Sequence, residues 1–380
     1  MQLTGEWISH PETQALCAAL SSAGFQALFV GGCVRNALLG LPVSDIDICT
    51  DARPQTVSDI AENAGFKAIP TGIEYGTVTI IAGRIPHEVT TFRQDLKTDG
   101  RRAVVAFSAD IAQDAARRDL TMNALYARAD GTVIDPLGGM ADLLARRVRF
   151  VGDPSQRIAE DFLRILRFFR FHAHFADPEL GLDGEALAAC AANLGGLANL
   201  SKERVGQEMK KLLSAKNPAP AVAAMAHTGV LNALLPGASA RFLAPLVHLE
   251  DDRPPDWRRR LVVLGGGHWD ERLKLSRAET RDLTALHDGI SALQSEAALG
   301  FRLGAELGQS AVLARAALFE SPLLPAWERE VHRGAVARFP VRAADLPDLS
   351  GPDLGARLRQ LQDVWLQTGL TATKADLLGR

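Results

Sequence analysis

With 380 residues, of which 47% are hydrophobic, the chain exceeds what one hydrophobic core usually supports, so we expect two to four domains. A net charge of −3 argues against indiscriminate nucleic-acid binding, and no apolar run approaches the ~18 residues that span a bilayer. Four scattered cysteines without C-x-x-C spacing argue against a disulfide framework and a zinc site, and the first residues lack a leader-like apolar stretch. These features predict a cytoplasmic protein.

The first ~140 residues alternate helical and strand patterns. Helices are predicted over residues 11–24, 32–40 and 54–64, and strands over residues 26–30, 43–49, 77–82 and 87–92. Residues 83–86 have the length of a hairpin connection between the last two strands. The polar residues 94–102 contain a glycine and show no periodicity, which predicts a mobile loop. We therefore expect an α+β unit with a small mixed sheet over residues 1–140.

The character of the sequence changes near Asp135–Asp142. From about residue 141 to the end, helical patterns are separated by proline and glycine, and almost no strand signal remains. The last 165 residues are amphipathic and rich in alanine and leucine, which is typical of the core of a helical bundle. The sequence thus predicts an α+β unit followed by an all-α remainder.

Two aspartates at the second predicted strand are the most informative residues of the chain. The segment Ser44-Asp45-Ile46-Asp47-Ile48 alternates polar and apolar, so both carboxylates lie on one face of the strand while the isoleucines enter the core. Carboxylates at this spacing repel each other unless a cation lies between them. Mg²⁺ prefers oxygen ligands of this kind, completed by substrate phosphates. A solvated strand edge is the alternative for an isolated D-x-D.

A pair of glycines precedes the helix before this strand. Gly31 and Gly32 can offer backbone N–H groups to a phosphate, and Arg35 adds a fixed positive charge. The G-x-G-x-x-G pattern of a dinucleotide-binding loop is missing, and an isolated Gly-Gly is usually only a tight turn. Together with Asp45 and Asp47, this order of residues predicts phosphoryl or nucleotidyl transfer.

Two further clusters carry charged and hydrogen-bonding side chains. In residues 117–124, Arg118 and Asp119 could hold a triphosphate and a ribose hydroxyl, although Asp119 could equally cap a helix. In residues 160–171, Asp161 and Arg164 are adjacent on a helix surface and can present an acceptor and a donor fork to one nucleobase. An ion-paired surface helix is the alternative for the second cluster.

These runs resemble the class II tRNA nucleotidyltransferase and bacterial poly(A) polymerase family, within the polymerase-β-like nucleotidyltransferase superfamily. Five segments match its motifs in order: GGCVRNALLG with DID, RRDLTMNA, DPLGGMADL, EDFLRILRFFRF and SKERVGQEM. The matches cover residues 28–212, and weaker similarity continues to the C-terminal helices. Five ordered motifs make the resemblance specific.

The resemblance implies roles for individual residues. Asp45 and Asp47 would bind Mg²⁺, with Glu88 as a candidate third catalytic carboxylate. The nucleotide-binding positions it implies are Gly31, Gly32, Arg35, Arg118, Asp119, Asn123, Asp161, Arg164, Arg167 and Arg170. Asn36 departs from the family, which usually has aspartate there, and we expect it to keep only a structural hydrogen bond.

The resemblance also implies a polymerase-β-like catalytic head (residues 1–140), a helical neck that reads the base (141–215), and a helical body and tail that bind RNA (216–380). Its members add CCA to the 3′ end of tRNA from CTP and ATP by Mg²⁺-dependent nucleotidyl transfer. Poly(A) addition is the nearest alternative, but residues 341–380 lack the strongly basic extension expected of it. A non-catalytic RNA- or nucleotide-binding relative is the alternative of a different class, and intact Asp45 and Asp47 argue against it.

Overall fold

The structure, a computed structural model, describes residues 1–99, 102–292 and 294–379. The chain divides into two compact units, one of residues 1–201 with 227–233 and one of residues 202–226 with 234–380. The predicted head lies wholly in the first unit. The predicted boundaries after residues 140 and 215 stay a prediction.

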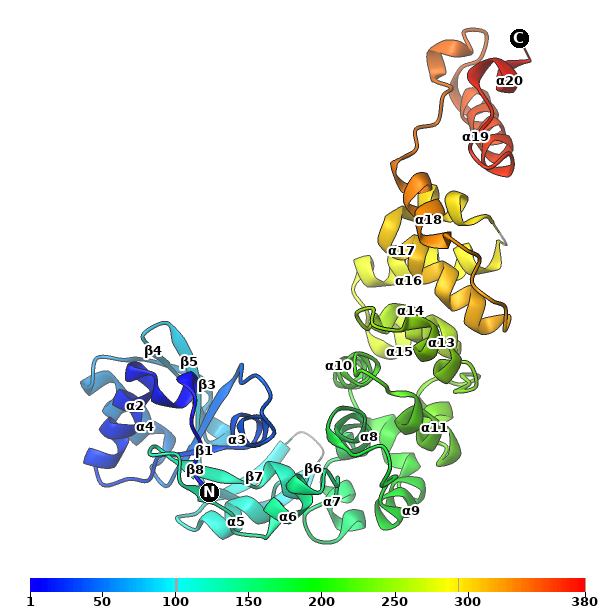
Figure 1. Ribbon diagram of the computed structural model, residues 1–380. Helices are drawn as coiled ribbons and strands as arrows, with labels where there is room; N and C mark the ends of the chain where they lie inside the picture. The colour runs from blue at the N-terminus through cyan, green and yellow to red at the C-terminus, as the bar shows by residue number, and fades with distance from the viewer. Residues whose placement is uncertain (100–101, 293, 380) are drawn as a thin grey trace. The chain divides into compact units, whose positions relative to one another are not determined.

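The first unit contains one mixed sheet with the strand order β3-β4-β5-β2-β1-β8-β9 (Figure 1). Its strands are β1 (Leu28–Val30), β2 (Ile46–Thr50), β3 (Lys67–Gly72), β4 (Thr77–Ala82), β5 (Ile85–Thr91), β8 (Tyr126–Arg128) and β9 (Val133–Ile134). Among the strand pairs in the described part of the chain, only β2 and β5 run parallel. The predicted mixed sheet is confirmed, with β3, β8 and β9 as strands that the sequence did not predict.

The helices of this region are α1 (Glu6–Ser9), α2 (Pro11–Ser22), α3 (Gly32–Leu38), α4 (Pro54–Asn63) and α5 (Ile111–Ala116). Three of them, α2, α3 and α4, lie within the predicted ranges, whereas α1 and α5 were not predicted. Both α2 and α4 begin with proline, whose fixed φ suits the first helical position. Helix α4 packs on β3, β4 and β5, and α2 packs on α4 and β4.

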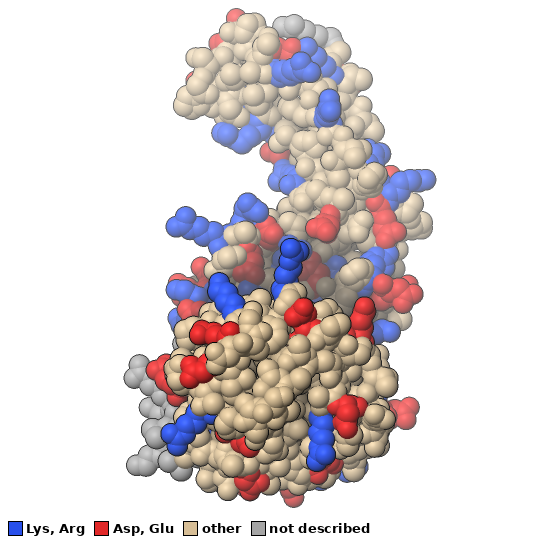
Figure 2. Space-filling model, turned by 90° about the vertical axis from the view of Figure 1, so that its left-hand side faces the viewer, with Lys and Arg blue, Asp and Glu red and all other residues tan. Residues whose placement is uncertain are grey.

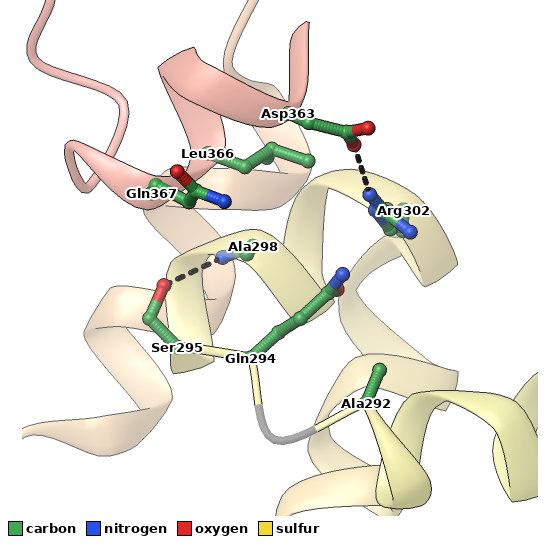
Figure 3. Close-up of a pocket in the computed structure, with 8 residues that line it drawn as sticks. All are labelled: Ala292, Gln294, Ser295, Ala298, Arg302, Asp363, Leu366 and Gln367. Atoms are coloured by element: carbon green, nitrogen blue, oxygen red, sulfur yellow. Dashed lines mark hydrogen bonds and ion pairs between the residues drawn. The ribbon is translucent and has the colours of Figure 1, made fainter. Parts of the chain in front are cut away.

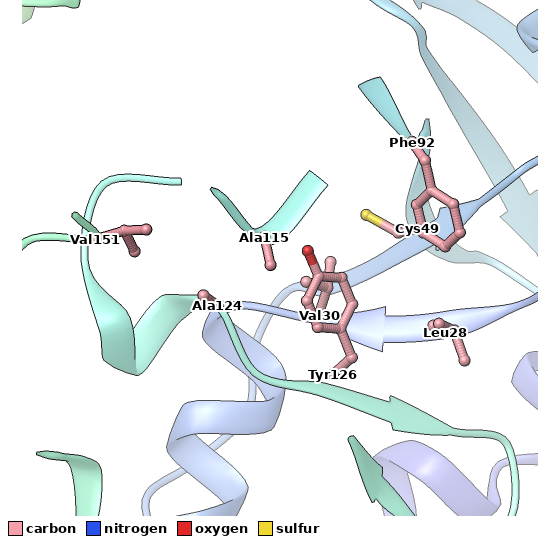
Figure 4. Close-up of a cluster of buried hydrophobic side chains, with 8 residues drawn as sticks. All are labelled: Leu28, Val30, Cys49, Phe92, Ala115, Ala124, Tyr126 and Val151. Atoms are coloured by element: carbon pink, nitrogen blue, oxygen red, sulfur yellow. The ribbon is translucent and has the colours of Figure 1, made fainter. Parts of the chain in front are cut away.

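A cluster of buried side chains joins the central strands to α5 (Figure 4). Its members are Leu28, Val30, Cys49, Phe92, Ala115, Ala124, Tyr126 and Val151. Strand β1 lies near the middle of the sheet and all three of its residues are buried, so it carries a continuous apolar run, whereas β2 keeps the half-buried Asp47 between two buried isoleucines. All four cysteines are buried free thiols, as their spacing predicted.

The predicted loop at residues 94–102 was wrong. Strands β6 (Arg93–Asp99) and β7 (Arg102–Phe107) form a separate two-stranded antiparallel sheet. Asp99 pairs with Arg102, so two residues connect the strands, and residues 100–101 of the predicted loop lie outside the described residues. A hairpin that is not part of a larger sheet need not alternate polar and apolar residues, so its strands carry no period-two signal. The dipeptide Asp99-Gly100 was the sequence signal for a hairpin.

The remainder is helical, as predicted. In the part of the chain that the structure describes beyond residue 140, extended pairing is limited to isolated bridges. The helices are α6 (Gly139–Leu144), α7 (Pro154–Glu160), α8 (Leu163–Phe175), α9 (Gly184–Ala192), α10 (Lys202–Leu213), α11 (Ala219–His227), α12 (Val230–Leu234), α13 (Leu243–Glu250), α14 (Trp257–Leu264), α15 (Trp269–Leu273), α16 (Arg277–Ser291), α17 (Glu296–Leu318), α18 (Trp327–Val336), α19 (Gly351–Gln367) and α20 (Lys374–Leu378). Short 3₁₀ turns are η1 (Ile73–Tyr75), η2 (Thr121–Asn123), η3 (Leu194–Asn199) and η4 (Ala343–Asp345).

The second unit combines close helix packing with a buried ion-pair cluster. A Cβ atom at Gly300 would lie 1.9 Å from the carbonyl oxygen of Val331, so only glycine lets α17 and α18 approach so closely. Arg260, 1% exposed, pairs with Glu250 and donates from Nη1 to the carbonyl oxygens of Leu213 and Ala215 at 2.6 and 2.5 Å. The guanidinium thereby satisfies carbonyl groups at the C-terminal end of α10.

A pocket of about 540 Å³ lies between the start of α17 and α19 in the second unit (Figure 3). Its lining residues are Ala292, Gln294, Ser295, Ala298, Arg302, Asp363, Leu366 and Gln367. Arg302 and Asp363 form an ion pair of 2.7 Å at its mouth, and both side chains are exposed. None of the residues predicted to bind nucleotide or metal lines this pocket. Across the described residues, every helix is too short or too polar to traverse a lipid bilayer.

Candidate active site

The two aspartates at β2 have different surroundings. Asp45 is exposed immediately before the strand, and Asp47 is half-buried within it. Ile46 and Ile48 are buried, with exposed fractions of 7% and 0%. The predicted alternation is therefore confirmed, with the isoleucines in the core and both aspartates on the opposite side.

Glu88 lies next to Asp47 because β2 and β5 pair in parallel with these two residues in register. Burial, followed by the charge of Glu88 and a smaller effect of Asp45, raises the pKa of Asp47 to about 6, against a lowering effect of Arg118. Asp47 and Glu88 thus lie side by side on neighbouring strands, with the charge of Asp45 acting on Asp47 as well, and the repulsion among these carboxylates would be relieved by a cation.

The donor set fits a hard divalent cation. In the described residues no group of three or more His, Cys, Asp or Glu side chains is arranged to hold a metal ion. Mg²⁺ needs no such complete cage, because it is commonly held by one or two carboxylates, with substrate phosphates and water as its other ligands. Asp45 and Asp47 match that arrangement, with Glu88 next to them.

The glycine turn lies between β1 and α3. Gly31 has a φ of 70°, which favours glycine, and Gly32 begins the helix. A Cβ atom at Gly31 would lie 3.6 Å from Nη1 of Arg118, so the turn and this guanidinium are neighbours. The structure therefore brings together two of the groups that the sequence assigned to phosphate.

Arg118 is held by partners that sequence reasoning missed. Its Nη2 donates to Asp114 Oδ2 at 3.0 Å and to Cys49 Sγ at 3.2 Å, and its Nε donates to the hydroxyl of Tyr126 at 3.0 Å. Asp114 also pairs with Arg117 at 2.7 Å. Burial alone would raise the pKa of Asp114, but the two guanidinium charges hold it well below its ordinary value.

Asp119 does not cap a helix, because it precedes the 3₁₀ turn η2, whose cap residue is Leu120. Its Oδ2 accepts from Nε of Arg167 at 2.6 Å, and its Oδ1 accepts from the side-chain amide of Asn123 at 3.1 Å. The oxygen of that amide in turn accepts from Nη1 of Arg35 at 2.6 Å. One buried network therefore connects α3, η2 and α8, with four of the predicted nucleotide-binding residues as its members.

Arg35 is buried, with its guanidinium 4.2 Å from the ring centroid of Phe175. Burial, followed by the charge of Arg170, lowers the pKa of Arg35 to about 10. Asn36 donates from Nδ2 to the carbonyl oxygen of Pro42 at 2.9 Å and accepts from Arg35 through its side-chain oxygen. The structural hydrogen bond predicted for Asn36 is therefore present.

Of the predicted base-reading pair, Arg164 lies in the first turn of α8, whereas Asp161 lies in extended backbone between α7 and α8. The prediction that both residues share one helix surface was therefore wrong, because the helix is interrupted at Asp161. Oδ1 of Asp161 accepts from the backbone N–H of Leu163 at 3.0 Å. Arg164 pairs with Glu160 at 2.5 Å and donates from Nη2 to the carbonyl oxygen of Arg117 at 2.9 Å. The ion pair of Arg164 with Glu160 is what the alternative of an ion-paired surface helix predicted. The hydrogen bond to the carbonyl oxygen of Arg117, in contrast, holds Arg164 against the residues that follow α5.

The remaining cations of α8 lie further along the helix. Arg170 lies with its guanidinium 4.5 Å from the ring centroid of Phe171, and Arg167 lies 5.4 Å from the same ring. These two residues have surroundings different from those of Arg164. On the face shown in Figure 2, Lys and Arg side chains are interspersed with acidic ones and with wide uncharged areas. Runs of arginine in the sequence thus do not form a continuous basic field on that face.

Sequence reasoning missed Asp114, Tyr126 and Glu160 as members of this site. Asp114 is four residues before Arg118 and three before Arg117, the two spacings at which helical side chains meet, and this was an available signal. Glu160 is likewise four residues before Arg164. Tyr126 had no signal, because its contact depends on β8 pairing with β1.

Comparisons with known proteins show which proteins this chain is similar to. The sequence matches the poly A polymerase head domain over residues 27–149 and the probable RNA and SrmB-binding site of polymerase A over residues 180–242. It is 34% identical to the mitochondrial CCA tRNA nucleotidyltransferase 1 of Danio rerio, over 93% of this chain and 86% of that protein. The human protein of the same name is 32% identical, over 92% and 84%.

Among solved structures, the fold is similar to that of the Bacillus stearothermophilus CCA-adding enzyme in complex with CTP. The TM-score is 0.75 at 28% sequence identity, over 94% of this chain and 92% of that one. The match extends over the head and the helical remainder alike. Because a relative more than 30% identical is matched over nearly its whole length, the chain belongs to the family of CCA tRNA nucleotidyltransferases, the CCA-adding enzymes.

Proposed function

We propose that this protein adds CCA to the 3′ end of tRNA, using CTP and ATP and releasing pyrophosphate, without a nucleic-acid template. The observation that carries the proposal is the in-register pair of Asp47 and Glu88 beside Asp45, next to the Gly31 turn and Arg118. This is a cluster of carboxylates within reach of groups that can hold a triphosphate. The family and its poly A polymerase-like head support the same reaction.

Asp45 and Asp47 would hold Mg²⁺, which when bound would neutralise charge on the reacting phosphate and on the attacking RNA 3′-hydroxyl. The remaining work falls to positioning by the protein. Gly31 and Gly32 would face the triphosphate through backbone N–H groups, and Arg118 would compensate its charge. Glu88 would keep the local potential negative enough to favour a cation.

The buried network would hold the nucleoside. Asp119 and Asn123 lie where a ribose hydroxyl could be bound, and Arg35 and Arg167 keep them in place from either side. Asp161 and Arg164 would present an acceptor and a donor to the base edge of CTP or ATP, with Arg170 in support. The choice of base would therefore depend on the side chains of Asp161 and Arg164 and on the residues that hold them in place.

We further propose the division predicted from sequence, with residues 1–140 as catalytic head, 141–215 as base-reading neck and 216–380 as RNA-binding body and tail. A cytoplasmic location is likewise proposed, because the four cysteines are buried free thiols, as is usual in a reducing compartment. The vertebrate relatives are named mitochondrial, so localisation of a tagged full-length chain in its own cell is the direct test.

The reaction is tested with a tRNA transcript that lacks its 3′ CCA. The transcript is incubated with the protein, Mg²⁺ and each labelled nucleotide alone and in combination, and the added tails are sequenced. We expect CC with CTP alone and CCA with CTP and ATP. Runs of adenosine would instead identify a poly(A) polymerase, and no incorporation would identify a non-catalytic relative.

A further inference from the structure

Asp114 accepts hydrogen bonds at both of its carboxylate oxygens, and the roles proposed above for metal, phosphate, ribose and base do not include it. Its side chain on α5 is 0% exposed. Its Oδ1 accepts from Nε of Arg117 at 2.9 Å and from the backbone N–H of Arg93 at 3.4 Å. Its Oδ2 accepts from the hydroxyl of Tyr126 at 2.7 Å and from Nη2 of Arg118 at 3.0 Å.

The single negative charge of Asp114 lies between the two positive charges of Arg117 and Arg118. The side chains of Arg117 and Arg118 are only 15% and 17% exposed, and both guanidinium groups form an ion pair with the carboxylate of Asp114. Loss of the negative charge would leave two neighbouring cations that repel each other in a largely buried place. Each arginine would then turn away from its present orientation.

The orientation of the Arg118 guanidinium decides whether its Nη1 lies near the Gly31 turn, where we expect the triphosphate. Asp114 holds Nη2, and the hydroxyl of Tyr126 holds Nε. Figure 4 shows that hydroxyl at the end of a ring packed in the core beside Ala115 and Cys49. With two of its nitrogens fixed, the guanidinium has Nη1 close to the Gly31 turn.

A second connection runs through the backbone of Arg117. Its carbonyl oxygen accepts from Nη2 of Arg164 at 2.9 Å, and the carbonyl of Ala116 accepts from Nη1 of Arg157 at 2.8 Å. These carbonyls lie at the C-terminal end of α5, where the helix dipole favours cations. Because Asp114 fixes the side chain of Arg117, it also fixes the peptide on which Arg164 rests.

We propose that Asp114 is a positioning residue that sets Arg118 for the triphosphate and, through Arg117, sets Arg164 for the base. The inference rests on the proposed function, because it assigns a nucleotide to this site. Asp114 itself touches neither phosphate nor base. A single carboxylate therefore links the strength of nucleotide binding to the choice of base.

The test compares Asp114→Asn with wild type in nucleotide addition to tRNA ending before CCA. We expect the KM for CTP to rise about tenfold with a smaller change in kcat, since a lost hydrogen bond to a charged group has about this effect. Incorporation of UTP and GTP relative to CTP should rise as Arg164 loses its fixed support. A substitution that only loosens the fold would lower kcat and leave the choice of base unchanged.

A double-mutant cycle separates action through Arg118 from a general effect. If Asp114 acts through this arginine, Asp114→Asn should raise the KM no further in an Arg118→Ala background. Asp110→Asn is the matched control, because Asp110 caps the same helix by accepting from Ala112 N–H at 2.8 Å but takes no part in the arginine contacts. It should leave the KM and the choice of base at wild-type values.

Tyr126→Phe decides the matter if Asp114→Asn does not fold, because it removes one donor to Asp114 and one acceptor of Arg118 without changing a charge. It should raise the KM for CTP about threefold. The inference would be overturned if the folded variants kept the wild-type KM and choice of base, or if the effects in the double-mutant cycle were fully additive. In either case, CCA addition by the wild-type protein would still support the proposed function. A wild-type protein that adds no nucleotide would overturn both.

Discussion

Replacing Asp47 by asparagine is expected to stabilise the folded protein while it abolishes nucleotide incorporation. Burial and then the charges of Glu88 and Asp45 raise the pKa of Asp47 from 3.8 to about 6. Between these values the folded state binds more protons than the unfolded state, so the wild-type protein loses stability as the pH rises. The shift corresponds to about 3 kcal/mol of unfolding free energy at pH 8 and about half of that at pH 5.

The assay is urea unfolding at pH 5 and pH 8 with a chelator present, for wild type, Asp47→Asn and Asp45→Asn. Asp45 is exposed, so its replacement should change the unfolding free energy by only about 0.5 kcal/mol or less. Added Mg²⁺ should stabilise wild type, because the ion binds the folded carboxylates and not the unfolded chain, and it should stabilise Asp47→Asn much less.

Two results would refute this reasoning separately. An Asp47→Asn protein that gains no stability at pH 8, or gains equally at pH 5 and pH 8, would show that the carboxylates do not repel each other as described. Alanine at either aspartate that retained incorporation at saturating Mg²⁺ would instead refute the metal assignment.

Three further predictions concern other parts of the chain. Arg164→Ala should reduce discrimination among the four nucleotides by about 1–3 kcal/mol and weaken RNA binding less, as relative incorporation rates and a binding titration will show. Deleting residues 95–101 should leave both C additions nearly intact and suppress the addition of the terminal A. The reason is that one base-reading pair serves two bases, so part of the pocket must move between the additions. A variant that melts like wild type and completes CCA at the normal rate would disprove this. Arg260→Ala should cost about 3–5 kcal/mol of unfolding free energy, because it disrupts a buried ion pair, whereas Arg241→Ala, which removes the exposed pair with Glu320, should cost less than about 1 kcal/mol.

The strands that the sequence predicted are those whose side chains enter the core. Strands β2 and β4 place Ile48 and Ile80 at 0% exposure, so burial produced the apolar signal. Strand β3 is largely exposed and contains Pro70, which lacks a backbone donor and is tolerated at the edge of the sheet. The hairpin of β6 and β7 lies outside the main sheet, and its sequence lacks the alternation of polar and apolar residues that marks β2 and β4.

The candidate site was predictable where its members are close in sequence and not where they are brought together by folding. The two-residue spacing of Asp45 and Asp47 is enough by itself to put both carboxylates on one face of a strand. The network that connects Arg35 to Arg167 joins three elements far apart in the chain, and no local pattern marks it. The spacing of Asp114 to Arg117 and Arg118 indicates ion pairs, but such pairs are typical of exposed helix surfaces, and the burial of Asp114 depends on elements that pack against α5.

The parallel pairing of β2 with β5 restricts the insertions and deletions that the protein can tolerate between β4 and β5. Glu88 has Asp47 beside it on one edge and Thr79 on the other, and β5 is joined to β4 by only Gly83 and Arg84. One residue inserted in that turn would offset β5 and bring His87 or Val89, both buried, beside Asp47 in place of a carboxylate. In an insertion scan, this two-residue turn should therefore be among the least tolerant positions of the head, although it is exposed and contains none of the residues assigned to metal or nucleotide.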